Sequence, residues 1–286
     1  MSQQDEDGHY SSMWEDFAKL KAESYLNYKF KPTHRIGLTN HLREASITNL
    51  LKPQKQDRVL DAGCASGRQL FQVASLISEG HGTDIASAFT DKATEYARSN
   101  NIGNLEFQRA VLESIPHPDA YFDKIICAEV LEHVFDKNIA LTELKRVLKP
   151  GGKLIITVPN LNADGTLWGR LLRLIGLRSF TPLEGFSMNE INKHGDAHVR
   201  EFNAKTLSGW LESSGFTVEK IHSVSFIDGP YFDFLLKIPL HWGPAQKTII
   251  TLERLLSSTG LFWGRHLAAR AKLDIFPPVH QDVQQQ

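Results

Sequence analysis

The chain has 286 residues, a length that suits one α/β domain with additions. Apolar residues make up 41% and charged residues 23%, as is usual for a globular protein. The net charge of −1 argues against a nucleic-acid-binding protein, since such proteins usually carry a basic excess or a basic stripe. Two cysteines, Cys64 and Cys127, are too few for a disulfide framework, so we expect reduced thiols.

The first part of the chain is predicted to be helical. It begins with polar and acidic residues, unlike a signal peptide, and no segment approaches the ~18 consecutive apolar residues of a membrane-spanning helix. We therefore expect a cytoplasmic protein.

Residues 9–51 show helical spacing of apolar residues, which Pro32 interrupts, and a second helix is expected over 38–51. This region predicts an N-terminal helical cap over residues 1–51.

From residue 58 onward, short apolar segments alternate with amphipathic ones. Strands are expected at 58–62, 80–85, 105–109, 122–128, 153–158 and 216–224. Segment 267–273 fits a last strand, although its alanines fit a helix equally well. Helices are expected at 91–100, at 138–148 and after Asn203, a potential N-cap. The alternation predicts an α/β, Rossmann-like domain over 52–286, with a seven-stranded, mostly parallel sheet.

Two segments, at about 159–202 and 226–266, interrupt this rhythm and are interpreted as lid insertions. Both contain many apolar and aromatic residues, which favours a hydrophobic or aromatic acceptor beneath them. Within the first, 167–178 is apolar with recurring arginines. This segment could lie on an anionic membrane surface, act as a lid, or simply pack on the core.

The most informative segment is Asp61-Ala-Gly63-Cys-Ala65-Ser-Gly67, where a strand turns sharply into a helix. A dinucleotide site would need G-x-G-x-x-G to seat a pyrophosphate, and the acidic residue here would repel that group. A carboxylate instead favours S-adenosylmethionine (SAM), whose sulfonium and ammonium groups are cationic. Asp84, at the end of the second strand, can accept both ribose hydroxyls, which SAM and NAD share.

These residues resemble motif I of class I SAM-dependent methyltransferases, with Ala65 in place of the middle glycine. Segments 122–134, 144–152 and 198–216 resemble, in order, later motifs of the ubiquinone-pathway O-methyltransferase group. The resemblance covers roughly 58–224. In the third-strand motif, Val111 stands where many relatives carry Asp, so adenine would be held by apolar contacts and backbone N–H groups.

The resemblance assigns a set of cofactor-binding residues. The methionine half of SAM would lie against Asp61, Gly63, Ala65 and Gly67, the ribose would bind Asp84, and Ile85, Val111 and Leu112 would flank adenine. Ala128 is a further cofactor-binding residue.

Histidine 133, directly after the fourth strand, is the candidate general base, because a histidine can take a proton from an acceptor hydroxyl near neutral pH. Alternatively, Glu132 and His133 only orient loops beside the cofactor. Candidate acceptor-binding residues are Trp14, Asn160, His194 and His198. Trp14 could equally belong to a core, Asn160 to a turn, and the two histidines to a surface loop. No metal is expected, since Gly195 and the absence of a matching carboxylate or Cys pair argue against a site at the histidines.

The expected function is SAM-dependent methylation of a small hydrophobic or phenolic acceptor, with oxygen favoured by analogy to the similar group. Methylation at carbon or nitrogen, or of a lipid or sugar intermediate, remains the alternative among enzymes. From another class, the alternative is a non-catalytic SAM-binding partner protein. A nucleic-acid acceptor is not expected, and membrane contact would be peripheral, through 167–178.

Overall fold

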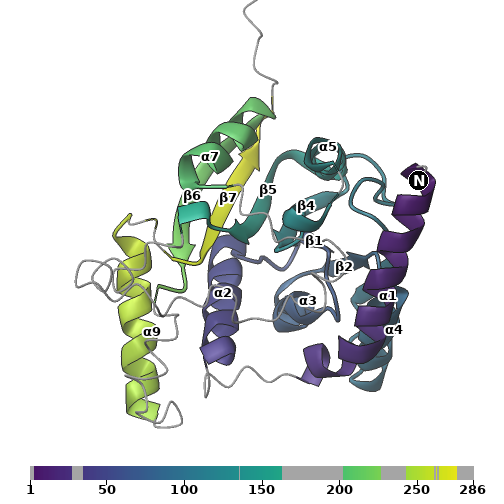
Figure 1. Ribbon diagram of the computed structural model, residues 1–286, viewed down its shortest axis with the longest axis horizontal. Coiled ribbons are helices and arrows are strands. Elements are labelled where there is room, and N and C mark those ends of the chain that lie inside the picture. Colours follow the sequence, from purple (N-terminus) through teal and green to yellow (C-terminus); the bar gives the residue numbers. More distant parts are fainter. Residues whose placement is uncertain are drawn as a thin grey trace, which may run out of the picture.

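A computed structural model of the chain describes residues 3–27, 35–134, 136–162, 202–226, 243–260, 262 and 264–275 (Figure 1). Its helices are α1 (Gln3–Asn27), α2 (Arg35–Leu51), α3 (Arg68–Val73), α4 (Ser87–Ser99), α5 (Lys137–Val147), α7 (Ala204–Ser213) and α9 (Gly243–Ser258), with 3-10 turns η1 (Ala74–Leu76) and η2 (Leu131–His133). Its strands are β1 (Arg58–Ala62), β2 (Glu79–Asp84), β3 (Leu105–Arg109), β4 (Phe122–Ala128), β5 (Leu148–Pro159), β6 (Phe216–Val224) and β7 (His266–Leu273).

The strands form one sheet in the order β3-β2-β1-β4-β5-β7-β6. Strands β1 to β5 pair in parallel, whereas β7 is antiparallel to both β5 and β6. The predicted seven-stranded, mostly parallel sheet is therefore confirmed, and the alanine-rich segment 267–273 is a strand. The strand order reverses between β1 and β4, and in open α/β sheets ligands bind beyond the carboxyl ends of the strands at such a point.

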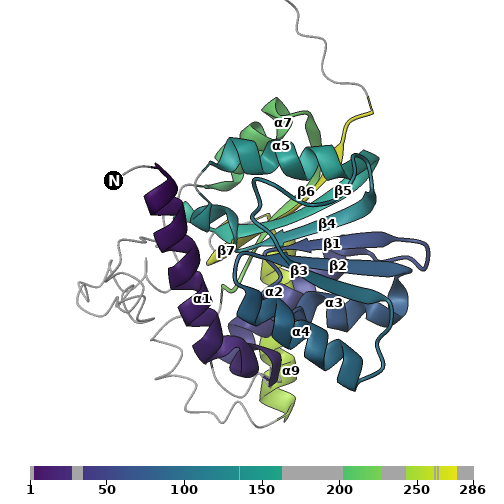
Figure 2. The same cartoon turned by 90° about the vertical axis from the view of Figure 1, so that its right-hand side faces the viewer.

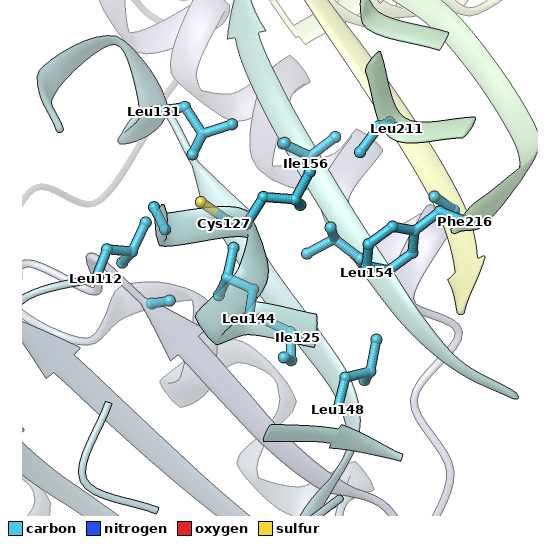
Figure 3. Close-up of a cluster of buried hydrophobic side chains, with 14 of the residues drawn as sticks. Leu112, Ile125, Cys127, Leu131, Leu144, Leu148, Leu154, Ile156, Leu211 and Phe216 are labelled. Carbon is cyan, nitrogen blue, oxygen red and sulfur yellow. The ribbon is translucent and has the colours of Figure 1, made fainter. Parts of the chain in front are cut away.

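Alternating side chains along the strands fill two cores, one on each face of the sheet. One face carries Leu60, Cys127 and Ile156 toward α5 and α7, in a core that also contains Leu144 and Phe216 (Figure 3). The opposite face carries Val59, Ile126 and Ile155 toward α2 and α3. Because both faces are covered, β4 and β5 read as continuous apolar segments rather than as alternating ones.

The two N-terminal helices lie in different places. Helix α2 packs on the sheet itself, where Ile47, Leu50 and Leu51 join the second core. Helix α1 crosses the carboxyl edge of the sheet and packs along α4 (Figure 2). The predicted cap over 1–51 is thus divided, because the apolar face of α2 completes the helical layer and only α1 covers the strand ends.

The two predicted insertions are described in part. Helix α7 follows the first insertion, and Asn203 is its N-cap. The Asn203 side chain accepts a hydrogen bond from the N–H of Thr206, as the sequence predicts. The second insertion contains α9, which packs beside α2 through Ile249 and Leu42 (Figure 1). Within the described residues, no helix is both long enough and apolar enough to cross a membrane.

Candidate functional site

The loop between β1 and α3 has a backbone that requires small residues. Gly63 and Gly67 have φ angles of 79° and 78°, in the left-handed region that favours glycine. A side chain at Gly63 would overlap Val130, and one at Gly67 would overlap Phe107. The N–H groups of Gly63 and Cys64 both donate to the carbonyl of Thr83, at 2.8 and 2.9 Å. The loop is therefore held close to the end of β2, and its two glycines cannot be replaced without displacing their neighbours.

Asp84 lies at the end of β2, directly beside this loop. Its carboxylate accepts the N–H of Ala65 at 2.9 Å and that of Ala86 at 3.0 Å. Burial raises the pKa of Asp84 to about 6, although these two hydrogen bonds act in the opposite direction. The carboxylate is thus fixed in place by backbone groups on two loops, and it retains lone pairs for further donors such as ribose hydroxyls.

Asp61, at the carboxyl end of β1, is 3% exposed. Burial and the negative charges of Asp84 and Glu44 raise its pKa to about 7. Burial is the larger cause, and the two neighbouring carboxyl groups add negative charge at the end of β1. A ligand that carries positive charge would relieve the repulsion, so the site favours a cation over a pyrophosphate.

The remaining residues predicted to bind the cofactor differ in exposure. Ile85 and Ala128 are half-buried at the carboxyl edge, where Ile85 directly follows β2 and Ala128 is the last residue of β4. Val111 is 41% exposed. Leu112 is buried in the core shared with α5, so only its backbone is free to line an adenine site.

Helix α1 lies across the carboxyl ends of the strands (Figure 2). Its Trp14 ring meets the ring of His133 edge-on, with centroids 5.1 Å apart, and the Tyr10 hydroxyl donates to the His133 carbonyl. Farther along α1, the Ser66 hydroxyl donates to the carbonyl of Ala22 at 2.9 Å. The predicted residues Trp14 and His133 are therefore neighbours, at the same edge as the loop after β1.

Asn160 has a structural role instead of the predicted contact with an acceptor. It is completely buried, and its amide donates to the carbonyls of Phe262 and Gly264 at 3.0 and 2.7 Å. Its side-chain oxygen accepts the N–H of Asn162 at 3.1 Å. All the polar atoms of this side chain are engaged in joining the end of β5 to the segment before β7.

Other predicted residues lie outside the described residues. These are His194, His198 and the basic segment 167–178. Among the described residues, no group of three His, Cys, Asp or Glu side chains is arranged to hold a metal ion.

Several charged residues near the carboxyl edge of the sheet were not predicted from the sequence. Glu44 on α2 is buried and pairs with Arg68 at 2.8 Å, which ties α2 to the residue after Gly67. These two side chains also border a polar groove of about 440 Å³ between α2, α3 and α9. Arg43 and His266 approach the other end of the site, near Glu129. No sequence spacing signals these residues, because they come from distant elements.

Comparison with known proteins agrees with this geometry. A family model described as a methyltransferase domain matches residues 53–193, which contain the glycine loop, Asp61 and Asp84. Over these residues the chain contains a methyltransferase domain of the class I SAM-dependent type. The residues fit the cofactor SAM, since the glycine loop permits close approach, Asp84 can accept hydroxyls, and the buried carboxyl group of Asp61 suits a cationic ligand.

Relatives of this methyltransferase include an uncharacterised methyltransferase of Schizosaccharomyces pombe, which is 30% identical over 63% of this chain and 64% of its own length. A ubiquinone biosynthesis O-methyltransferase of Bartonella tribocorum is 30% identical over 49% of this chain and 59% of its own. The chain thus spans less than two thirds of the length of these relatives. The solved structure of the cyclase SpnF shares the fold, with a TM-score of 0.55 and 20% identity over 82% of this chain and 80% of its own.

Proposed function

We propose that this methyltransferase methylates the oxygen of a phenolic or similar hydroxyl group on a small hydrophobic acceptor. The observation that carries this proposal is the position of His133 directly under the aromatic side chains of α1, at the edge where Asp61 and Asp84 form the cofactor site. An aromatic wall beside an imidazole suits an acceptor ring with an ionisable hydroxyl group. The Bartonella relative, by its name, is an O-methyltransferase of ubiquinone biosynthesis, which supports the same choice.

Each part of the site has a distinct task in this proposal. Bound SAM supplies a methyl group on a cationic sulfur. Asp61 and the glycine loop hold its methionine half, and Asp84 holds its ribose. Residues around α1 and η2 would orient the acceptor hydroxyl toward the methyl group and exclude water, and such positioning provides most of the rate enhancement. The acceptor is a small molecule, and we propose no nucleic-acid substrate because the chain has no basic excess.

The first experiment measures cofactor binding. We expect calorimetry to show micromolar binding of SAM and of S-adenosylhomocysteine to the wild-type protein. Asp84→Ala should lower this affinity at least tenfold, because a hydrogen bond to a charged group contributes about 1.5–3 kcal/mol. Asp84→Asn tests the charge alone with little change in volume. The exposed Asp91 of α4 provides the control, since Asp91→Ala should bind normally. Equal binding by Asp84→Ala would contradict the assignment of this site.

The second experiment identifies the acceptor atom. Purified protein and isotopically labelled SAM are incubated with catechols, simple phenols and hydrophobic-tailed phenols, and the product is analysed by mass spectrometry and NMR. Methyl transfer to oxygen supports the proposal. Transfer to carbon or nitrogen, or only to a lipid or sugar, replaces it with the corresponding alternative. Tight SAM binding without transfer to any acceptor would favour a non-catalytic binding protein.

A further inference from the structure

Three strands bring a second histidine to the carboxyl edge of the sheet. Glu129 directly follows β4, and its N–H donates to the carbonyl of Thr157 on β5 at 3.0 Å. His266 begins β7 and lies opposite Pro159, the last residue of β5. Because β7 is antiparallel, its first residue lies at the same edge as the last residues of β4 and β5. Nδ1 of His266 is 2.8 Å from Oε2 of Glu129.

The charges around this pair set the state of the glutamate. Arg43 of α2 places Nη1 3.7 Å from the same oxygen, Oε2. Burial raises the pKa of Glu129, but His266 and Arg43 outweigh it and lower the pKa to about 2. Glu132 of η2 is the other nearby acid, and burial together with the charge of Glu129 raises its pKa well above the usual range. Glu129 is therefore the ionised member of this cluster at neutral pH.

An ionised Glu129 also determines which nitrogen of His266 carries the proton. The carboxylate can only accept a hydrogen bond, so Nδ1 must donate its N–H. In the neutral ring, Nε2 then carries a lone pair. Among the described residues, no side chain or backbone group is hydrogen-bonded to this Nε2, and the side chain keeps 16% of its surface exposed. The arrangement is that of a base held in one tautomer by a carboxylate.

The backbone conformation of Glu129 indicates that the surrounding structure fixes the position of this residue. Its φ angle is 57°, a left-handed conformation that is unfavourable for a non-glycine residue. Such conformations persist where the surroundings require them, and they gather at functional sites. The next residue, Val130, packs against Gly63 of the cofactor loop. The Glu129–His266 pair therefore borders the wall of the cofactor site.

We propose that His266 is the general base for the acceptor hydroxyl and that Glu129 is its positioning residue. This inference rests on the proposed O-methylation. The acceptor oxygen forms a bond to the methyl carbon while the carbon–sulfur bond breaks, and the electron pair of that bond remains on sulfur. The hydroxyl proton passes to Nε2 of His266, and Glu129 stabilises the resulting imidazolium. His133, under Trp14, then serves to orient the acceptor ring.

The first test determines which ring nitrogen of His266 carries the proton, and it requires no acceptor. Imidazole nitrogens are labelled with ¹⁵N, and NMR spectra are recorded with bound S-adenosylhomocysteine. Loss of a signal in His266→Gln identifies His266. We expect Nδ1 protonated and Nε2 unprotonated at high pH in the wild type, and a mixture of tautomers in Glu129→Gln. A proton on Nε2 in the wild type would overturn the proposal, since no lone pair would then face the acceptor.

The second test uses a phenol that the wild-type protein methylates. His266→Gln should lower kcat by roughly 100-fold or more, as expected for loss of a general base. It should leave the affinity for S-adenosylhomocysteine unchanged and remove the fall of kcat at acidic pH. His117→Gln is the matched control, because His117 is a partly buried histidine of the loop before β4, where it meets Gln108. Glu129→Gln should lower kcat and retain the affinity for the cofactor.

The outcomes separate the two proposals. Unchanged kcat in His266→Gln, or an acidic limb that disappears only in His133→Ala, would refute the role of His266 and leave O-methylation intact. If the wild type binds SAM but methylates no hydroxyl group, O-methylation is wrong, and the base role of His266 is wrong with it. The tautomer then still shows whether Glu129 orients the ring.

Discussion

At the scale of single residues, Ala65 shows how this chain departs from its relatives without losing the loop. Its φ angle of 44° lies in the left-handed region, where a non-glycine residue costs about 1–2 kcal/mol. Its methyl group, however, packs in a cluster with Trp14 and Phe17 of α1 and Phe89 of α4. The alanine therefore gives α1 an apolar contact on the cofactor loop that a glycine could not provide.

The raised pKa of Asp61 predicts how stability depends on pH. An unfolded Asp releases its proton near pH 3.9, whereas the folded group holds it up to about pH 7. Between these values the folded state binds more protons than the unfolded state, so the free energy of unfolding should fall as pH rises. Asp84, with a pKa of about 6, acts in the same direction. We expect these two groups to lower the melting temperature of the ligand-free protein as pH rises from 5 to 8, whereas His222, whose pKa burial lowers to about 4, acts in the opposite direction below about pH 6.5.

Asp61→Asn tests this prediction by thermal denaturation across that range. The difference between variant and wild type isolates Asp61, because the other groups titrate in both proteins. The variant should be the more stable protein at pH 8, and its advantage should shrink toward pH 5. It should also show a smaller stabilisation by SAM, since the cation loses its carboxylate partner. Parallel melting curves for the two proteins would contradict the shifted pKa.

At the scale of elements, α1 is joined to the segments after β1, β2 and β4 and to Arg109, the last residue of β3, whose guanidinium donates to the Ser11 hydroxyl at 2.7 Å. Ser66 donates to the carbonyl of Ala22, the Ser87 hydroxyl donates to Glu15 at 3.2 Å, and Tyr10 donates to the His133 carbonyl. All three contacts lie at the carboxyl edge. The position of α1 is thus linked to the loops that form the site, whereas α2 is part of the core.

Helix α7 offers an element-scale prediction away from the site. Asn203 accepts the N–H of Thr206 at 3.0 Å, and the Thr206 hydroxyl accepts the N–H of Asn203 at 2.9 Å. This reciprocal pair satisfies donors that the first turn leaves open. Asn203→Ala should lower the free energy of unfolding by about 1 kcal/mol, as measured by urea denaturation. Asn203→Ser, which keeps a capping oxygen, is the control and should lose less. An equal loss in both variants would count against the cap.

At the scale of the whole molecule, stability depends on the two cores that enclose the sheet. Leu144 of α5 is completely buried in the larger core, whereas Leu20 of α1 is 81% exposed. Leu144→Ala should lower the free energy of unfolding by about 2–5 kcal/mol, because it removes buried methyl groups and leaves a cavity. The same substitution at Leu20 should change it by less than about 0.5 kcal/mol. Chemical denaturation of both variants makes the comparison, and similar losses would be inconsistent with this core.

Local patterns in the sequence were enough to predict most of the elements and the cofactor loop, although not helix α9. The expected strand over 122–128 coincides with β4, and Asn203 caps its helix as its side chain predicts, because an apolar run and a capping side chain are properties of neighbouring residues. The acidic residue and glycines around 61–67 indicated a cationic ligand because charge and backbone freedom are properties of those residues themselves. Six strands followed from such segments, and the tertiary structure decided that 267–273 is the seventh strand and not a helix.

Contacts between distant segments were decided only by the tertiary structure. Glu129 and His266 are 137 residues apart, and they meet because β7 enters the sheet antiparallel beside β5. The side chain of Asn160 and its place after a strand suggested contact with a ligand, yet packing buries this residue completely. Likewise, α2 joins the core and α1 joins the site because their apolar residues pack against different elements, α2 against the sheet and α1 against α4. Such pairings follow from chain topology and the closing of the core, which no local pattern encodes.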